Sequence, residues 1–281
     1  MFTLTRIVTV VWVLMSSVSA FAADNIWKIF EVRGRASVIS GNAVRALSNE
    51  KSLLETIRQG SRVLTEAGGN VVIVSLKDGL AYEVGDSSEA TVEDEQVRAV
   101  RGTVTMKKGF LLPKAGDGRT GGIVMRGAGN TRSCLKAISP VNTAILELTP
   151  ELRWENNCDG LRRVTITILS DERVVHTAEC SETSFKIPAD VLQSGSRYMW
   201  MIDGGTNFDM ASGLFTIPAE ADRKEVLESI TGFSRETGED VSAMIAYIFF
   251  LDAKGLNELA RLESDKMRKR FPASQGLKEL P

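Results

Sequence analysis

The chain of 281 residues has little of what most catalytic and metal sites require. It contains one histidine, His176, and three cysteines, and no two of these form a Cys-x-x-Cys pair. A structural zinc ion usually takes four ligands from Cys and His, and a Ser or Cys nucleophile usually needs a His beside it. His176 lies in an alternating stretch and is expected on a sheet surface or edge. The sequence therefore predicts no enzyme, no cofactor and no metal site.

Neither sign of charge is in excess, because 34 Lys and Arg oppose 36 Asp and Glu for a net charge of −2. Such a balance gives no general attraction to nucleic acid, and no nucleic-acid partner is expected. Residues 113–137 are rich in Gly and Arg but lack the Gly-Lys-Ser/Thr ending of a phosphate-binding loop. We interpret them as a flexible linker between domains, with contact to an anionic envelope polymer as the alternative.

Long hydrophobic runs are also missing, except near the start. An apolar stretch from Ile7 to Met15 follows Arg6, and Ala20-Phe21-Ala22 fits a small-x-small cleavage site. Residues 1–22 are therefore predicted to be a signal peptide, with a mature chain that starts near Ala23. The alternative is an uncleaved anchor, which needs about 20 apolar residues. We expect a periplasmic or secreted protein with no stable membrane span after cleavage.

Residues 26–112 alternate between apolar and polar side chains and are rich in Val, Thr and Gly. Strands are expected at 30–39, 70–76, 80–84, 90–92, 97–100 and 103–106, and one helix-like segment at 51–58. Asp78-Gly79 stands between two apolar runs and predicts a tight turn, because Gly accepts the positive φ that such a turn needs. This region is expected to be an all-β domain.

Three segments of this region resemble the FecR-like periplasmic domain. They are Val32-Arg-Gly-Arg-Ala-Ser-Val38, Gly60-Ser-Arg-Val63 and the strand and turn from Val72 to Gly79. The resemblance implies an all-β module used in cell-envelope signalling and scaffolding. Signalling FecR proteins carry a cytoplasmic segment and a membrane helix before this domain, whereas here a predicted signal peptide precedes it. Direct control of a sigma factor is therefore not carried over.

Residues 138–218 show short strands separated by turns, which is typical of a β-sandwich. Pro150-Glu-Leu-Arg-Trp154 and the stretch from Leu192 to Trp200 resemble a fibronectin type III or immunoglobulin-like domain. The resemblance implies that Trp154, Leu192 and Tyr198 are structural residues, and that the Tyr198 hydroxyl bonds to upstream backbone in a tyrosine corner. The alternative for Trp154 and Trp200 is a sugar-stacking platform.

Cysteines 134, 158 and 180 are an odd number in an oxidising compartment. Cys158 and Cys180 flank a predicted hairpin, which would bring them to the same end of the sandwich. A disulfide between Cys158 and Cys180 is therefore predicted. Cys134 is left either free or as a substitute for one of these partners.

Residues 219–275 turn helical, with helices expected at 221–234, 240–251 and 256–271. The last pair resembles one tetratricopeptide-like hairpin. One repeat cannot bury its own apolar face, and the second helix is apolar over more surface than one partner covers. We expect it to pack on the neighbouring helices or the sandwich, with docking of another protein as the alternative.

The whole chain is thus predicted to be mainly β, with two β domains and a small C-terminal helical segment. The favoured function is a non-enzymatic cell-envelope interaction or scaffold protein that binds other envelope proteins through its β-modules and helical tail. The alternatives are a glycan- or peptidoglycan-binding envelope protein and an enzyme of unrecognised type.

Overall fold

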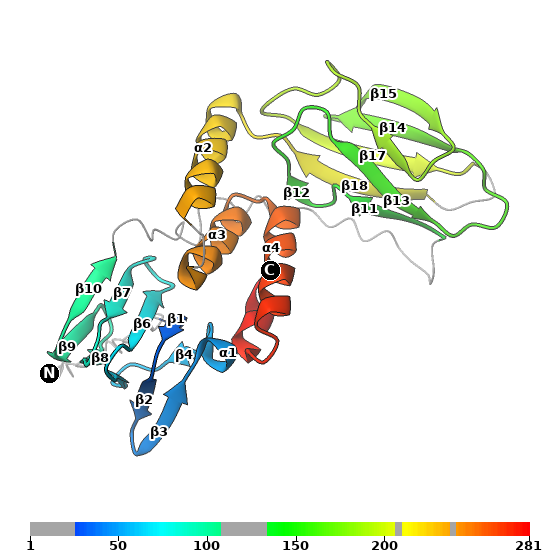
Figure 1. The fold of residues 1–281 in the computed structure, drawn as a ribbon. Helices are drawn as coiled ribbons and strands as arrows, with labels where there is room; N and C mark the ends of the chain where they lie inside the picture. Colours follow the sequence, from blue (N-terminus) through cyan, green and yellow to red (C-terminus); the bar gives the residue numbers. More distant parts are fainter. Residues whose placement is uncertain (1–25, 108–133, 206–209, 237–239) are drawn as a thin grey trace, which may run out of the picture.

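The computed structural model describes residues 26–107, 134–205, 210–236 and 240–281. The predicted signal peptide lies outside these ranges, as does the predicted linker up to residue 133. The described chain is mainly β, with four sheets in two modules and a set of helices between them (Figure 1).

The first module is built from two five-stranded antiparallel sheets that face each other across one core. Sheet A has the order β10-β7-β6-β1-β4, and sheet B has the order β3-β2-β5-β8-β9. The strands of sheet A are β1 (Trp27–Arg33), β4 (Thr56–Ile57), β6 (Asn70–Ser75), β7 (Ala81–Val84) and β10 (Val104–Lys107). Those of sheet B are β2 (Ala36–Ser40), β3 (Ala43–Leu47), β5 (Arg62–Thr65), β8 (Glu89–Val92) and β9 (Val97–Arg101).

Two local expectations for this module need correction, and one is confirmed. The single strand expected at 30–39 is divided into β1 and β2 by a turn at Gly34, whose φ is +64°. The helix-like segment expected at 51–58 shortens to α1 (Asn49–Ser52), followed by β4. The turn at Asp78-Gly79 is present: Gly79 has φ +71°, and the Asp78 carboxylate accepts the backbone N–H of Leu80 at 3.1 Å.

The second module is a sandwich of a three-stranded and a five-stranded sheet. Sheet C has the order β11-β13-β16, and sheet D has the order β12-β18-β17-β14-β15. Sheet C contains β11 (Leu135–Ser139), β13 (Glu151–Asn156) and β16 (Ser184–Lys186). Sheet D contains β12 (Thr143–Ala144), β14 (Val164–Ser170), β15 (Arg173–Cys180), β17 (Arg197–Asp203) and β18 (Met210–Thr216). The module therefore begins before residue 138, because β11 includes residues that we assigned to the linker.

Three α-helices and a short 3-10 helix follow the sandwich: α2 (Glu220–Glu236), α3 (Val241–Ala253), α4 (Asn257–Arg270) and η1 (Gln275–Glu279). The expected helix positions at 221–234, 240–251 and 256–271 agree with them closely. Asp240 begins α3 as its N-cap, and its side chain accepts the backbone N–H of Ala243. Gly255, with φ +73°, ends the α3 segment. Among the described residues, no helix is both long and apolar enough to cross a membrane.

Candidate functional site

The helices α2, α3, α4 and η1 lie between the two β modules, and we call them the helical junction (Figure 1). Helix α3 is the centre of this junction because its side chains enter two cores. Ile245 and Ile248 pack with Phe30, Val72 and Val74 of sheet A. On another side of the same helix, residues 250 and 251 pack with α2, α4 and the start of the sandwich. This double burial explains why α3 is apolar around its circumference.

The junction closes the outer face of sheet A in the first module. Lys28 of β1 is only 6% exposed and its ammonium group contacts the Glu279 carboxylate of η1 at 2.6 Å. The Ser274 hydroxyl donates to the Leu53 carbonyl at 3.0 Å. Gly276 lies so close to the Leu53 backbone that an added Cβ would collide with it. The last described residues therefore belong structurally to the first module.

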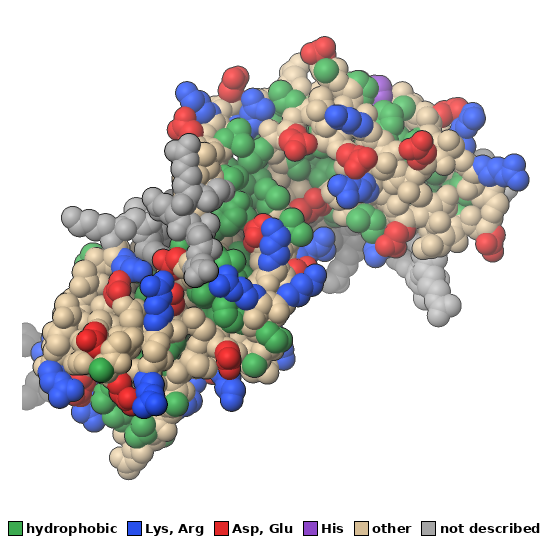
Figure 2. Space-filling view, in the orientation of Figure 1, with side chains coloured by type: hydrophobic (Ala, Val, Ile, Leu, Met, Phe, Trp, Pro, Cys, Tyr) green, Lys and Arg blue, Asp and Glu red, His purple; other side chains and the backbone are tan. Residues whose placement is uncertain are grey.

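The junction also holds the sandwich, through the first turn of α4. The Glu258 carboxylate accepts the Ser139 hydroxyl at 2.7 Å and the Val141 backbone N–H at 2.9 Å. The Asn257 amide donates to the Asn142 carbonyl at 2.7 Å. Beside them, the Ala144 N–H donates to the Gly255 carbonyl at 2.7 Å. One helix hairpin thus contacts both β modules, and Figure 2 shows hydrophobic side chains gathered between them on this face.

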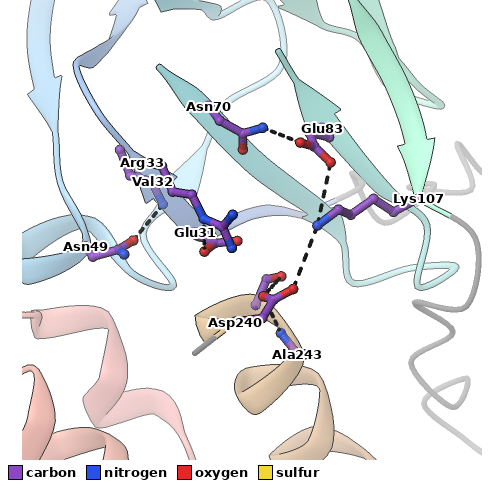
Figure 3. A network of polar contacts seen from close by, with 10 residues as sticks. Glu31, Val32, Arg33, Asn49, Asn70, Glu83, Lys107, Asp240 and Ala243 are labelled. Carbon is purple, nitrogen blue, oxygen red and sulfur yellow. Dashed lines mark hydrogen bonds and ion pairs between the residues drawn. The ribbon is translucent and has the colours of Figure 1, made fainter. Parts of the chain in front are cut away.

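A polar network lies where sheet A meets the N-terminus of α3 (Figure 3). Glu31 is buried, with 2% of the residue exposed, and its carboxylate accepts the Arg33 Nε–H at 2.7 Å. Lys107 lies between two acids, with its Nζ 3.6 Å from the Glu83 carboxylate and 4.0 Å from that of Asp240. Through Lys107, the network therefore joins β7 and β10 to the cap of α3, and the Glu31–Arg33 pair of β1 lies beside this cap (Figure 3).

The two carboxylates nearest the helix start have opposite shifts in pKa. Burial raises the pKa of Glu31, and the negative charge of Asp240 adds to the rise, although the hydrogen bond from Arg33 opposes it. Burial alone would also raise the pKa of Asp240. Hydrogen bonds from Ser242 and Ala243, with the nearby Lys107 charge, outweigh that effect, so the pKa of Asp240 is lowered. Asp240 is thus stabilised as an anion, whereas ionised Glu31 carries a desolvation cost.

The three residues expected to be structural lie in the sandwich core. Trp154 is 4% exposed, Leu192 is 5% exposed and Tyr198 is 2% exposed. The Tyr198 hydroxyl accepts the backbone N–H of Gln193 at 2.7 Å, which is the upstream bond expected of a tyrosine corner. Trp200 is fully buried, and its indole N–H donates to the Pro140 carbonyl at 2.8 Å. The alternative of a sugar-stacking platform at Trp154 and Trp200 is therefore wrong.

The predicted disulfide has the wrong partner. Cys158 bonds to Cys134, and Cys180 is a free, half-buried thiol. The reason is the register of sheet C, in which Leu135 of β11 stands opposite Asn156 of β13. This register puts Cys134 directly beside the residues that follow β13, and the Asn157 N–H donates to the Cys134 carbonyl at 2.7 Å. Cys180 instead ends β15 opposite Val164 in sheet D.

His176 lies on β15, which is an edge strand of sheet D, as the alternation indicated. Its ring is half-buried and stacks on Phe185, with 5.7 Å between the ring centroids. Within the described ranges, its buried Nε2 has no hydrogen-bond partner. No group of three or more His, Cys, Asp or Glu side chains within the described parts of the chain is arranged to hold a metal ion.

Several residues that build the junction were missed by the sequence analysis. Asp240 could have been found, because an acid directly before an apolar run is a helix-start signal. An acid inside an apolar strand, as in Phe30-Glu31-Val32, is also a signal of a buried polar contact. Lys28 and Glu258 gave no such signal, because their partners are distant in the sequence. Glu279 lies 251 residues from Lys28, and Val141 lies 117 residues from Glu258.

Comparison with known proteins adds little. No family model matches the sequence, and no curated protein matches it. One matching solved structure is titled "Biofilm associated protein - BSP domain"; it is 12% identical over 70% of this chain and 26% of that chain, with a TM-score of 0.22. This chain therefore spans about a quarter of that chain's length. With so low an identity and TM-score, the likeness carries no argument about fold or function.

Proposed function

We propose that this protein is a non-enzymatic cell-envelope scaffold, in which the helical junction holds two β modules in a fixed relation for binding other envelope proteins. The observation that carries the proposal is the double attachment of the α3–α4 hairpin. Its apolar face completes the core under sheet A, while Glu258 and Asn257 bind the backbone of the sandwich. A hairpin that joins two modules in this way fixes their spacing.

Two further points support an envelope location. The predicted signal peptide at residues 1–22 would export the chain, and a Cys134–Cys158 disulfide suits an oxidising compartment. Our proposal also takes the first module as FecR-like, on the sequence segments quoted above, and its all-β architecture is compatible with that assignment. The sandwich has the tyrosine corner that fibronectin-like and immunoglobulin-like modules use for their own stability.

Crosslinking mass spectrometry in the native envelope tests the proposal. The expected result is a reproducible set of envelope proteins crosslinked to both β modules of the same chain. The matched variants are Glu258→Ala, which removes the contacts to Ser139 and Val141, and Glu263→Ala, which removes an ion pair with Lys266 on the same helix. The Glu258 variant should lose partners that contact both modules, and the Glu263 variant should keep them.

Two outcomes would count against the scaffold. If the native chain crosslinks to no envelope protein, the scaffold function is overturned. If the Glu258→Ala and wild-type chains recover the same partners in equal amounts, the proposed role of the junction is overturned. Cosedimentation with purified peptidoglycan tests the alternative. Binding at low salt without protein partners would favour a glycan-binding function instead.

A further inference from the structure

The central strand of sheet D presents a symmetric pattern on its outer face. In β17, Tyr198, Trp200 and Ile202 are buried in the sandwich core. Successive side chains of a strand alternate between the two faces. The outward residues are therefore Arg197, Met199, Met201 and Asp203, of which the two methionines and Asp203 are partly exposed. Read along the strand, this face is positive, apolar, apolar and negative.

The uncharged middle of this pattern extends across four neighbouring strands, with one apolar row and one row that is mostly Thr and Ser. Cross-strand partners share a face of the sheet, and the register aligns two rows. The first row consists of Val174, Leu169, Met199 and Leu214, and the second consists of Thr177, Thr167, Met201 and Ser212. Both rows are uncharged, and Val174 is 60% exposed. None of the apolar members belongs to a core cluster among the described residues, so the rows form an outward-facing surface.

Charges stand only at the two ends of this surface. Arg197 lies at the start of β17, and Asp203 lies at its end, about 20 Å away at roughly 3.4 Å per residue. The third row, at the Asp203 end, also contains Glu179 and Thr165. Within the described ranges, neither Arg197 nor Asp203 takes part in an ion pair, although Asp203 accepts the Gly205 N–H at 2.7 Å. At the Asp203 end, Glu179 is neutralised by an ion pair with Arg163, and at the Arg197 end the turn between β14 and β15 also carries the exposed acids Asp171 and Glu172. Arg197 and Asp203 are thus the two charges of β17 itself, of opposite sign, at opposite ends of one uncharged face.

This arrangement is complementary to itself under one particular rotation. A two-fold axis that runs parallel to the sheet and perpendicular to β17 reverses the order of the rows in a second copy. Arg197 then faces the partner's Asp203, and Asp203 faces the partner's Arg197. The row of Met199 faces the row of the partner's Met201. Such an interface is isologous and closed, as dimer interfaces with two-fold symmetry are, and flexible methionines adapt well to packing between sheets.

We propose that the outer face of sheet D binds a second copy of this chain, sheet against sheet, with the two β17 strands antiparallel. The footprint supports a weak dimer. Four strands spaced at about 4.8 Å and seven residues at roughly 3.4 Å cover about 450 Å² on each copy. The total of about 900 Å² is at the low end of specific interfaces, so a reversible dimer is expected. The proposal is independent of the envelope partners discussed above.

Charge reversal tests the proposal on the mature full-length chain by sedimentation velocity. Arg197→Glu places two acids together, and Asp203→Arg places two arginines together, so each single variant should dimerise at least about tenfold more weakly at low salt. An equimolar mixture of the two single variants should form a heterodimer, because both of its contacts are then attractive. The double variant should dimerise like the wild type. Arg153→Glu reverses an exposed charge on sheet C, which forms the other side of the sandwich, and should change nothing.

Asp203 also holds the turn at Gly205, so a fold control is needed. The melting temperature measured by circular dichroism must agree between each variant and the wild type. A further variant, Asp203→Asn, removes the charge and keeps an acceptor for the Gly205 N–H. Weaker dimerisation of this variant supports the proposal. A wild-type chain that stays monomeric at about 100 µM, which is ample for a weak interface of this size, overturns it. Single variants that fail to form a heterodimer when mixed overturn it as well.

Discussion

The two β modules bury their sheets in different ways. In the sandwich, sheets C and D face each other, and the module is closed by internal devices, namely the Cys134–Cys158 disulfide and the Tyr198 corner. In the first module, sheet A is covered on both faces, by sheet B on one side and by the helical junction on the other. One module is therefore self-contained, whereas the other depends on residues at the far end of the chain.

Removal of residues 219–281 should have the largest effect, because it exposes one whole face of sheet A. Phe30, Val72 and Val74 each contribute about 1.5–3 kcal/mol when buried. Their sum, roughly 5–9 kcal/mol, is comparable to the net stability of a whole domain, about 5–15 kcal/mol. The first module should unfold while the sandwich stays folded. Hydrogen exchange should show lost protection in β6 and retained protection in β17.

The control for this truncation is a chain of residues 134–218, which retains both cysteines of the disulfide and should fold alone. Full exchange protection of β6 in the truncated protein would contradict the dependence of the first module on the junction.

Loss of the disulfide should selectively destabilise the sandwich. The bond joins residues 24 apart in the sequence, and closure of a loop of this size adds about 3 kcal/mol by restricting the unfolded chain. Cys134→Ser with Cys158→Ser should lower the unfolding transition of the sandwich and leave that of the first module in place. Cys180→Ser is the matched control and should have little effect, because that thiol is free.

Two tyrosines make a smaller and sharper comparison between the modules. Tyr198→Phe leaves the Gln193 N–H without its acceptor, which should cost about 1–3 kcal/mol. Tyr82 of sheet A is also buried, but its hydroxyl takes part in no hydrogen bond among the described residues. Tyr82→Phe should therefore change stability less. The free energy of unfolding of both variants is measured by chemical denaturation. Equal losses of this free energy in Tyr198→Phe and Tyr82→Phe would argue against a stabilising role for the tyrosine corner.

The smallest effect is expected at Glu31, and it should depend on pH. Because the pKa of Glu31 is raised on folding, the folded state favours its protonated form, and stability falls as pH rises from the unfolded pKa through the folded pKa. Glu31→Gln removes this fall, so the variant should be more stable than the wild type at pH 7. The lowered pKa of Asp240 has the opposite sign, and its contribution is lost as pH falls below its usual range.

Thermal unfolding of Glu31→Gln and the wild type at a series of pH values measures the difference. The advantage of the variant should shrink as pH drops below the raised pKa of Glu31. An advantage that stays constant over this range would mean that ionisation of Glu31 is not its cause.

Local features of the fold were predictable, and distant contacts were not. Some features depend only on neighbours in the sequence, and the sequence carries a signal for each of them. They are the strand alternation in β14 and β17, the turn at Gly79 and the start of α3 at Asp240. The cover of sheet A by α3 and the Cys134–Cys158 bond depend on which elements meet. For the cysteines, the register of β11 against β13 decided the partner. A single sequence contains no direct measure of that register.

The contact between Ser274 and Leu53 joins residues 221 positions apart, and this separation affects the order of folding. Sheet A cannot complete its core until the helices at residues 220–270 have left the ribosome. The sandwich, made of residues between these partners, is free to fold earlier. Long-range contacts of this kind slow folding because a large loop must close first. During synthesis, the module that appears first is therefore the last to become stable, and its exposed apolar sheet is a natural substrate for chaperones.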